Sequence, residues 1–279
     1  MDLLIAYAAA LGCSICNGVS TVLQKVGADH ESGIHSFDLT FLLRLFRNVP
    51  YSIGTSLALM AYVLSLVALR VLPLFLVQAL IAASIMVTAF GERLFLHKKL
   101  SKKTYRALAI IIFGLVLLAI SAISGRADTS NHGARLLVEL LPLPIALIGL
   151  FFLYVRKTMA AGILAALAGL SFGNTSTIGR ILVYPTPFWK VVENPLFACL
   201  VVSAILGQYL FSVSLQRASA TQSNAVMIAT QTLGPAACGL LLFGDRVRPG
   251  FELVVLLGTL LVIVGSALTA VEELPVATI

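Results

Sequence analysis

Long apolar runs without a charged residue alternate with short polar, mostly basic segments along almost the whole chain. The clearest run, residues 71–91, is followed at once by Glu92-Arg93 and then by a group of lysines. A helix that crosses a bilayer needs about 20 predominantly apolar residues. The pattern therefore predicts nine spanning helices, at residues 3–24, 50–69, 71–91, 107–124, 136–155, 158–179, 195–216, 218–244 and 253–271.

A shorter apolar segment lies at residues 37–48, where Arg44 and Arg47 fall on one face of a helix. Helices of this kind lie in the membrane interface, because long basic side chains reach from there to the lipid headgroups. We expect an interfacial helix at this position. The alternative is a tenth span, which would reverse the predicted orientation of the chain in the membrane.

The composition agrees with a membrane protein. Of 279 residues, 59% are hydrophobic and 11% are charged, whereas a soluble domain carries about 25% charged residues. The net charge of +7 comes from basic residues between the apolar runs, and cytoplasmic loops of membrane proteins collect lysine and arginine. We therefore predict an all-α polytopic membrane protein that is surrounded by membrane lipids and has no nucleic-acid partner.

The chain repeats one order of features, which predicts an internal duplication. The matching positions are Tyr62 and Tyr209, Arg70 and Arg217, Gln78 and Gln231, and Gly91-Glu92-Arg93 and Gly244-Asp245-Arg246. Four crossings followed by one linker crossing start the second unit on the opposite side of the membrane, so the two units are expected to be inverted. The predicted organisation is a first four-helix repeat at 1–124, a loop and linker helix at 125–157, and a second four-helix repeat at 158–279.

These features resemble a known group of transporters. The first repeat, with Pro73, Gly91-Glu92-Arg93-Leu94 and Phe113-Gly114-Leu115-Val116, is similar to one subunit of the small multidrug resistance transporters. The whole chain resembles the fused, duplicated members of the drug/metabolite transporter superfamily, of the EamA type and the nine-span branch. The resemblance implies inverted repeats and alternating access, and it selects no substrate.

One position departs from that resemblance. The small multidrug resistance transporters have a membrane-embedded glutamate on the first helix, and Asn17 occupies this place here. None of the acidic residues falls in the middle of a predicted span. Proton-for-cation exchange through that glutamate is therefore disfavoured. A dehydrated Mg²⁺ site is disfavoured as well, because it needs carboxylate ligands.

Polar side chains inside the predicted spans indicate a cavity near the middle of the membrane. It would suit a neutral, zwitterionic or amphipathic small molecule. The expected lining residues are Gln78, Gln231, Asn17, Tyr62, Tyr209, Asn174 and Gln208. The alternative for each is a hydrogen bond between neighbouring helices, worth about 0.6–2 kcal/mol. Gly234-Pro235 predicts a kink in the eighth span, either as part of a gate or as a packing feature.

Basic residues mark the ends of the predicted spans. Lys25 and Arg180 end the first helix of each repeat, and Arg70 and Arg217 mark the turns after the second. They either anchor the helices to headgroups or attract an anionic group of a substrate. The four cysteines lie in spans and the four histidines in loops, so neither a metal site, a cofactor nor an enzyme is predicted.

The sequence thus favours a secondary transporter with alternating access. Two alternatives stay open, a flippase or carrier of lipid-linked or polyprenyl phosphate substrates, and a membrane scaffold without transport activity. The bias of basic residues places the amino terminus outside and the carboxyl terminus in the cytoplasm, with the protein in the cell membrane.

Overall fold

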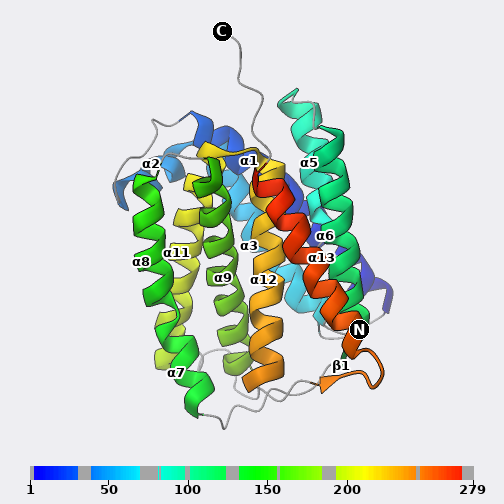
Figure 1. Ribbon diagram of the computed structural model, residues 1–279. Helices are drawn as coiled ribbons and strands as arrows, with labels where there is room; N and C mark the ends of the chain where they lie inside the picture. Colours follow the sequence, from blue (N-terminus) through cyan, green and yellow to red (C-terminus); the bar gives the residue numbers. More distant parts are fainter. Residues whose placement is uncertain are drawn as a thin grey trace.

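The computed structural model describes residues 3–30, 39–69, 81, 83–97, 101–123, 132–155, 158–183, 193–242 and 246–271. These residues form a helical bundle with one pair of two-residue strands (Figure 1). The helices are α1 (Leu3–Asp29), α2 (Leu39–Arg47), α3 (Val49–Leu69), α5 (Ser84–Phe95), α6 (Lys102–Ser121), α7 (His132–Leu140), α8 (Pro142–Tyr154), α9 (Thr158–Val183), α11 (Pro195–Arg217), α12 (Ala220–Leu242) and α13 (Glu252–Val271).

Six helical segments are long and apolar enough to cross a membrane: Leu3–Asp29, Lys102–Ser121, Arg135–Tyr154, Met159–Gly179, Pro195–Arg217 and Glu252–Thr269. The chain is therefore an all-helical, multi-pass membrane protein, as the apolar runs predicted. Val49–Ser65 is a shorter apolar helix. Of the predicted span at 71–91, the described part is Ile81 and residues 83–91, so the count of nine stays a prediction.

Several helices extend beyond their predicted ends. Helix α1 continues past Gln24 to Asp29, and α5 continues past Gly91 to Phe95. The predicted linker helix is interrupted at Leu141 between α7 and α8, because Pro142 has no backbone N–H to donate to the preceding turn. The predicted loop before it ends early, since α7 begins at His132.

Helix α2 lies at one end of the bundle (Figure 1). It buries Phe41, Leu42 and Leu45 and exposes Arg44 and Arg47. Its nine residues span about 13 Å at 1.5 Å per residue, which is less than half of a hydrocarbon core of about 30 Å. The described part of this segment is thus an amphipathic helix that is too short to cross, and its place at the membrane interface stays a prediction.

The helices before and after α7–α8 pack in equivalent sets. Helix α1 packs against α3 and α5, and α9 packs against α11 and α12. The last helices of the two sets, α6 and α13, pack against each other. The set formed by α1, α2, α3, α5 and α6 is called the first half below, and the set formed by α9, α11, α12 and α13 is called the second half.

Helices α6 and α13 cross at two glycines. A Cβ atom on Gly114 would lie 2.8 Å from the carbonyl oxygen of Gly258, and one on Gly258 would lie 2.9 Å from the carbonyl oxygen of Gly114. Strand β1 (Ala122–Ile123) follows α6 and pairs antiparallel with β2 (Arg246–Val247), which precedes α13. The end of α6 therefore adjoins the start of α13, and the two helices run in opposite directions.

Candidate functional site

A buried set of polar side chains joins α1 and α3 to α11. The Nε2 atom of Gln208 lies 3.0 Å from Oε1 of Gln24 and 2.6 Å from the hydroxyl of Tyr51 and donates to both. The Tyr51 hydroxyl is also 2.6 Å from Oγ of Ser212. On α1, Gln24 donates to Oγ of Ser20 at 2.9 Å. These five residues form what we call the polar seam, in which neutral amides and hydroxyls connect the two halves.

Two glycines bring α1 and α3 close enough to form the seam. A Cβ atom on Gly54 would lie 2.9 Å from the backbone nitrogen of Gln24, and one on Gly27 would lie 2.5 Å from the Cβ atom of Tyr51. Larger residues would push these helices apart. Gln24 and Tyr51 therefore reach Gln208 together, and both are almost completely buried.

Further contacts between the halves lie one turn beyond the seam. Lys25 is buried, and its ammonium group binds Asp29 and donates to the carbonyl oxygen of Leu215. The side chain of Gln216 donates to the carbonyl oxygen of Ala28 at 3.0 Å. Because Gln24 pairs with Gln208 and Ala28 with Gln216, α1 and α11 run in the same direction and end together.

Glu92 near the end of α5 binds the start of α12. Its carboxylate accepts hydrogen bonds from the backbone N–H groups of Ala220 at 3.1 Å and Thr221 at 2.9 Å, and from the Thr221 hydroxyl at 2.6 Å. Glu92 has no exposed surface. A negative charge is stabilised at a helix N-terminus by the unpaired N–H groups and the helix dipole. Within the described residues, Glu92 has no ion-pair partner.

The start of α12 also has a cap of its own. Ser219 Oγ accepts from the backbone N–H of Gln222 at 3.1 Å, and the Gln222 side chain accepts from the backbone N–H of Ser219 at 3.4 Å. This is a capping box, with a serine before the helix and a glutamine three residues later. The end of the bundle made by the ends of α1, α5 and α11 and the starts of α3 and α12 is called the sealed face below.

A second polar layer lies one turn deeper, between α5, α12 and α1. The Thr88 hydroxyl donates to the carbonyl oxygens of Ser84 at 3.0 Å and Gly18 at 3.3 Å. Asn224 donates from Nδ2 to the Thr88 hydroxyl at 2.8 Å. Within the described part of the chain, the buried atoms Asn224 Oδ1 and Ser84 Oγ have no hydrogen-bond partner. The layer thus retains unused hydrogen-bonding capacity.

Three of the predicted cavity residues contact other helices. Gln208 belongs to the polar seam, and the neighbouring Tyr209 is buried with its ring edge-on to Phe41 at 6.1 Å between centroids. Asn174 donates to the carbonyl oxygen of Val138 at 3.0 Å and to Oγ of Ser203 at 3.1 Å. In this conformation Asn174 therefore joins α9 to α7 and α11.

Asn17 and Gln231 lie at similar depth in the bundle. At 1.5 Å per residue, Gln231 is roughly 15 Å along α12 from Thr221, and Asn17 is roughly 16 Å along α1 from Ala28. Both side chains are half-buried. Tyr62 is more exposed, and its hydroxyl lies 3.1 Å from where a Cβ atom of Gly179 would be. Asn17 and Gln231 thus lie near the middle of α1 and α12.

Some of the predicted binding residues lie outside the described residues, and the predicted kink lies within a continuous helix. Gln78 and Arg70 fall outside the described residues, as do the side chains of Arg180 and Pro235. Helix α12 continues through Gly234-Pro235, and Gly234 is half-buried. The role of these residues stays a prediction.

The predicted anion-binding residues Lys25 and Arg217 have protein partners. The Arg217 guanidinium donates to the carbonyl oxygens of Phe152, Leu153 and Val155 at 2.7–3.1 Å. These carbonyls lie at the end of α8, where basic side chains are favoured. Arg217 therefore fastens α11 to the linker helix, and Lys25 fastens α1 to α11.

Burial changes along the two helices that meet the first half. Every residue of α12 from Ala220 to Ala229 is buried, and residues 230–234 are half-buried. In α11 every residue from Tyr209 to Leu215 is buried, whereas from Pro195 to Gln208 the buried residues are Leu196, Ser203 and Gly207. Along α11 and α12, burial is therefore continuous near the sealed face and incomplete beyond the middle of the helices.

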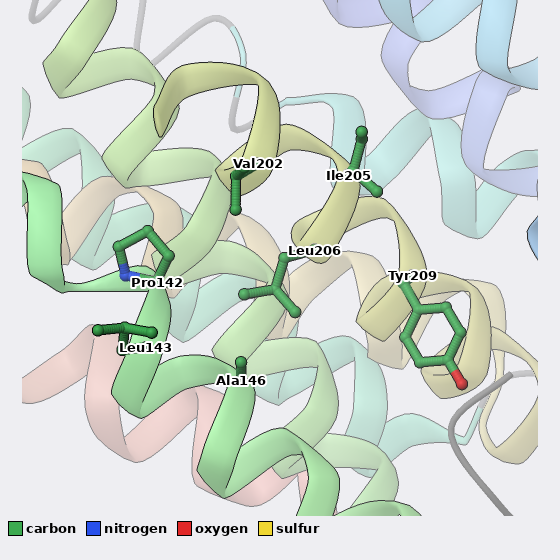
Figure 2. Close-up of a pocket in the computed structure, with 7 residues that line it drawn as sticks. All are labelled: Pro142, Leu143, Ala146, Val202, Ile205, Leu206 and Tyr209. Carbon is green, nitrogen blue, oxygen red and sulfur yellow. The ribbon is translucent and has the colours of Figure 1, made fainter. Parts of the chain in front are cut away.

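An apolar pocket of about 260 Å³ lies between α8 and α11. Figure 2 shows its lining residues, Pro142, Leu143, Ala146, Val202, Ile205, Leu206 and Tyr209. Tyr209 is the one predicted cavity residue among them. This pocket is thus distinct from the polar seam.

Sequence reasoning missed Tyr51, Ser212 and the contact of Glu92 with α12. Ser219 and Gln222 have the spacing of a capping box, which marks the start of α12. The partners of Tyr51 and Glu92 are more than a hundred residues away in the chain, and no local pattern points to them. Within the described residues, no group of three or more His, Cys, Asp or Glu side chains is placed to bind a metal ion.

No protein-family model, curated protein or solved structure matches this chain.

Proposed function

We propose that this protein is a secondary transporter of a small neutral, zwitterionic or amphipathic solute. Two inverted four-helix units, residues 1–124 and 158–279, move against each other in alternating access. The linker helix formed by α7 and α8 joins them. The observation that carries this proposal is a buried, hydrogen-bonded seam of neutral side chains between two halves whose matching helices run in opposite directions.

The directions follow from contacts at the helix ends. Helices α1 and α11 run in the same direction, because Gln24 meets Gln208 and Ala28 meets Gln216. Helix α3 is antiparallel to α1, since Gly54 lies against Gln24 and Gly27 against Tyr51. Helix α3 therefore opposes its counterpart α11.

The same reasoning applies to α9. It is antiparallel to α11, because the Ser214 hydroxyl bonds the carbonyl oxygen of Ala161 near the start of α9, and Ser171 bonds that of Ser203. Helix α1 runs with α11 and thus opposes its counterpart α9. Opposed counterparts are expected of inverted repeats, which are related by a two-fold axis in the membrane plane.

The remaining counterparts contact each other directly. Helix α5 meets α12 through Glu92 and Thr221 and through Thr88 and Asn224, and α6 meets α13 at Gly114 and Gly258. Both pairs run antiparallel. A helix that contacts its counterpart in the other repeat lies beside the two-fold axis that relates the repeats. The pairs α5–α12 and α6–α13 therefore support such an axis, which passes between the two helices of each pair.

The chemistry of the seam favours an uncharged or zwitterionic solute. Its amides and hydroxyls both donate and accept hydrogen bonds, and Lys25 is neutralised by Asp29. We propose that the solute binds near the half-buried Asn17 and Gln231, with Gln78 as the repeat counterpart of Gln231. Opening of the sealed face would break the seam and free Gln208, Tyr51 and Gln24 for the solute.

The proposed orientation places the sealed face in the cytoplasm. This end carries several basic residues on α2, α5 and α6. They are Arg44, Arg47, Arg93, Lys102, Lys103 and Arg106. By the positive-inside rule, the amino terminus is then outside and the carboxyl terminus inside the cell membrane.

The apolar pocket favours one second candidate, a carrier of lipid-linked or polyprenyl phosphate substrates. The pocket between α8 and α11 (Figure 2) is lined by apolar side chains, which suit an apolar chain. Arg217 lies two turns along α11 from Tyr209, toward the sealed face. A phosphate near this arginine would place the apolar chain in the pocket.

A ligand-dependent thermal-shift screen on the purified protein tests the proposal. The panel contains amino acids, nucleosides, sugars, cationic drugs and polyprenyl phosphates, and the variant is Asn17→Ala/Gln231→Ala. Ser266→Ala is the matched control, because its hydroxyl bonds the carbonyl oxygen of Val262 on its own helix. The proposal is supported if a small solute stabilises the parent and Ser266→Ala but does not stabilise the double variant. Stabilisation by polyprenyl phosphates alone, unchanged in the double variant, supports the carrier.

A further inference from the structure

Glu92 is a buried carboxylate whose hydrogen-bond partners among the described residues all belong to the second half. Three donors reach it, two backbone N–H groups and the Thr221 hydroxyl. Ionisable groups inside a membrane protein are costly to bury and are a functional-site hypothesis by default. Glu92 is also the acidic residue of the repeated Gly-acid-Arg motif, and this motif is not part of the proposed solute site.

We infer that Glu92 is a proton-binding site, and that its protonation releases α5 from α12 and opens the sealed face. Its role as the coupling site for transport rests on the proposed function. The conformational response to protons does not, and it is measured on the purified protein without a solute.

The chemistry of the contact supports this role. A carboxylate accepts all three hydrogen bonds, with its charge at the positive end of the α12 dipole. A proton taken up from water bonds to one carboxylate oxygen and cancels the charge. That oxygen then carries an O–H group in a place surrounded by donors and accepts less well, so protonation weakens the contact with Ala220 and Thr221. No other bond is made or broken.

Helix α12 does not depend on Glu92 alone. The capping box of Ser219 and Gln222 lies within the second half and stays in place when α5 moves away. The helix start therefore remains capped in both conformations. A contact that can be lost without unwinding the helix is suited to a reversible switch.

Among the described residues, these hydrogen bonds are the interactions that stabilise the charge of Glu92. On α1, the charged residues near this end are Lys25 and Asp29, which bind each other. Helix α12 carries no charged residue from Ala220 to Leu242. Arg93 on α5 is exposed, and Arg217 donates to carbonyls of α8. Protonation of Glu92 thus changes the charge of the contact itself.

The test measures the distance between two spin labels across the sealed face as the pH is lowered. Phe95→Cys on α5 and Met159→Cys on α9 place the labels on exposed residues of different halves. The protein is purified, reconstituted in lipid and studied by pulsed electron paramagnetic resonance. The native cysteines are replaced by alanine in the parent: Cys13, Cys16, Cys199 and Cys238.

In the parent, acidification is expected to shift the population from a short to a longer label distance. Glu92→Gln removes the charge at nearly constant shape and is expected to show the longer distance at every pH. Glu92→Asp keeps a carboxylate and is expected to retain the pH response. A parent that does not respond to pH, or a Glu92→Gln variant with the response of the parent, would overturn the inference.

Two further variants complete the experiment. Asp29→Asn removes the other carboxylate that the described residues place at this face, and it is expected to keep the response of the parent. Loss of the response in this variant would assign the response to Asp29. Thr221→Val removes one donor without changing the charge, and it is expected to raise the long-distance population at alkaline pH. It keeps the inference testable if Glu92→Gln does not fold. If the label distance responds to pH but the thermal-shift screen finds no solute, the result contradicts the proposed transport function and leaves the proton-binding role of Glu92 standing.

Discussion

The two ends of the bundle are held together by different chemistry. At the sealed face, side chains of one half bond the other half through the seam, Lys25 and Glu92. At the opposite end, α6 and α13 are joined by the backbone pairing of β1 and β2. Between the ends, the same helices approach to backbone contact at Gly114 and Gly258.

This difference indicates which part moves. A hydrogen bond between side chains contributes about 0.5–1.5 kcal/mol net, because water replaces it when it breaks. A close-packed helix crossing has no such replacement, since separating it leaves a void. We therefore expect the α6–α13 crossing to act as the fixed axis and the sealed face to open and close. The following predictions test this comparison.

Substitution at the glycine crossing is expected to have the largest effect. Gly114→Leu places a side chain where the Gly258 carbonyl oxygen already lies 2.8 Å from a Cβ position. Overpacking costs about 1–3 kcal/mol where neighbours can adjust, and backbone adjusts least, so we expect a loss of folded protein. Thermal unfolding in detergent measures this. Phe113→Leu, at an exposed neighbouring position, is the control and should melt like the parent.

Removal of the Glu92 side chain is expected to come next. Glu92→Ala leaves the N–H groups of Ala220 and Thr221 without their acceptor, and an unsatisfied buried group costs about 1–3 kcal/mol. The melting temperature should fall, and less than in Gly114→Leu. Glu193→Ala, at an exposed glutamate, should leave it unchanged. Equal melting temperatures of Glu92→Ala and Glu193→Ala would contradict a stabilising contact between α5 and α12.

The polar seam is expected to show a smaller, pairwise effect. A double-mutant cycle with Gln24→Ala and Gln208→Ala should give a coupling free energy of about 0.6 kcal/mol and at most about 1.7 kcal/mol, the average and the maximum for hydrogen bonds between membrane helices. Unfolding in mixed detergent measures it. The matched cycle pairs Gln24→Ala with Ser266→Ala on α13, and we expect no coupling there. Additive effects of Gln24 and Gln208 would mean that their hydrogen bond does not stabilise this conformation.

The smallest effect is expected at the edge of the sealed face. Asp29→Asn weakens the ion pair with Lys25, and Asp29 is 39% exposed. Lys25 is buried, but Asp29 reaches solvent, where a charge contributes little, and Lys25 keeps its bond to the Leu215 carbonyl. The melting temperature should change by less than in Glu92→Ala. A larger fall in melting temperature than in Glu92→Ala would mean that the Lys25–Asp29 pair, and not Glu92, makes the main contribution to closing the sealed face.

Much of the helical layout follows from the sequence. Uncharged apolar runs locate the helices, and the membrane class follows from composition. The helix ends are harder to predict, because a charged residue with partners inside the bundle does not end its helix. Lys25 lies inside α1, since Asp29 and the Leu215 carbonyl satisfy its charge. Glu92 lies inside α5, since α12 satisfies its carboxylate.

The candidate site was predicted only in part. Gln208 was expected at the interior because it is a polar residue in an apolar run, and it joins the halves. Tyr51 lies at the start of a span, where a tyrosine fits the interface equally well. Its partners Gln208 and Ser212 are set by the packing of α3 on α11. Such long-range pairs depend on the tertiary structure and leave no periodic signal in one sequence.

The most direct test of alternating access needs no substrate. A single cysteine at Asn17 is reacted in liposomes with a membrane-impermeant thiol reagent, added from one side or the other. A second protein carries Ala28→Cys and Gln216→Cys, which a disulfide joins across the sealed face where the Gln216 side chain bonds Ala28. We predict that position 17 reacts from both sides, and that the disulfide blocks reaction from the sealed side alone. Reaction from one side only in the protein without the disulfide, or unchanged reaction from both sides when the disulfide is present, would contradict alternating access.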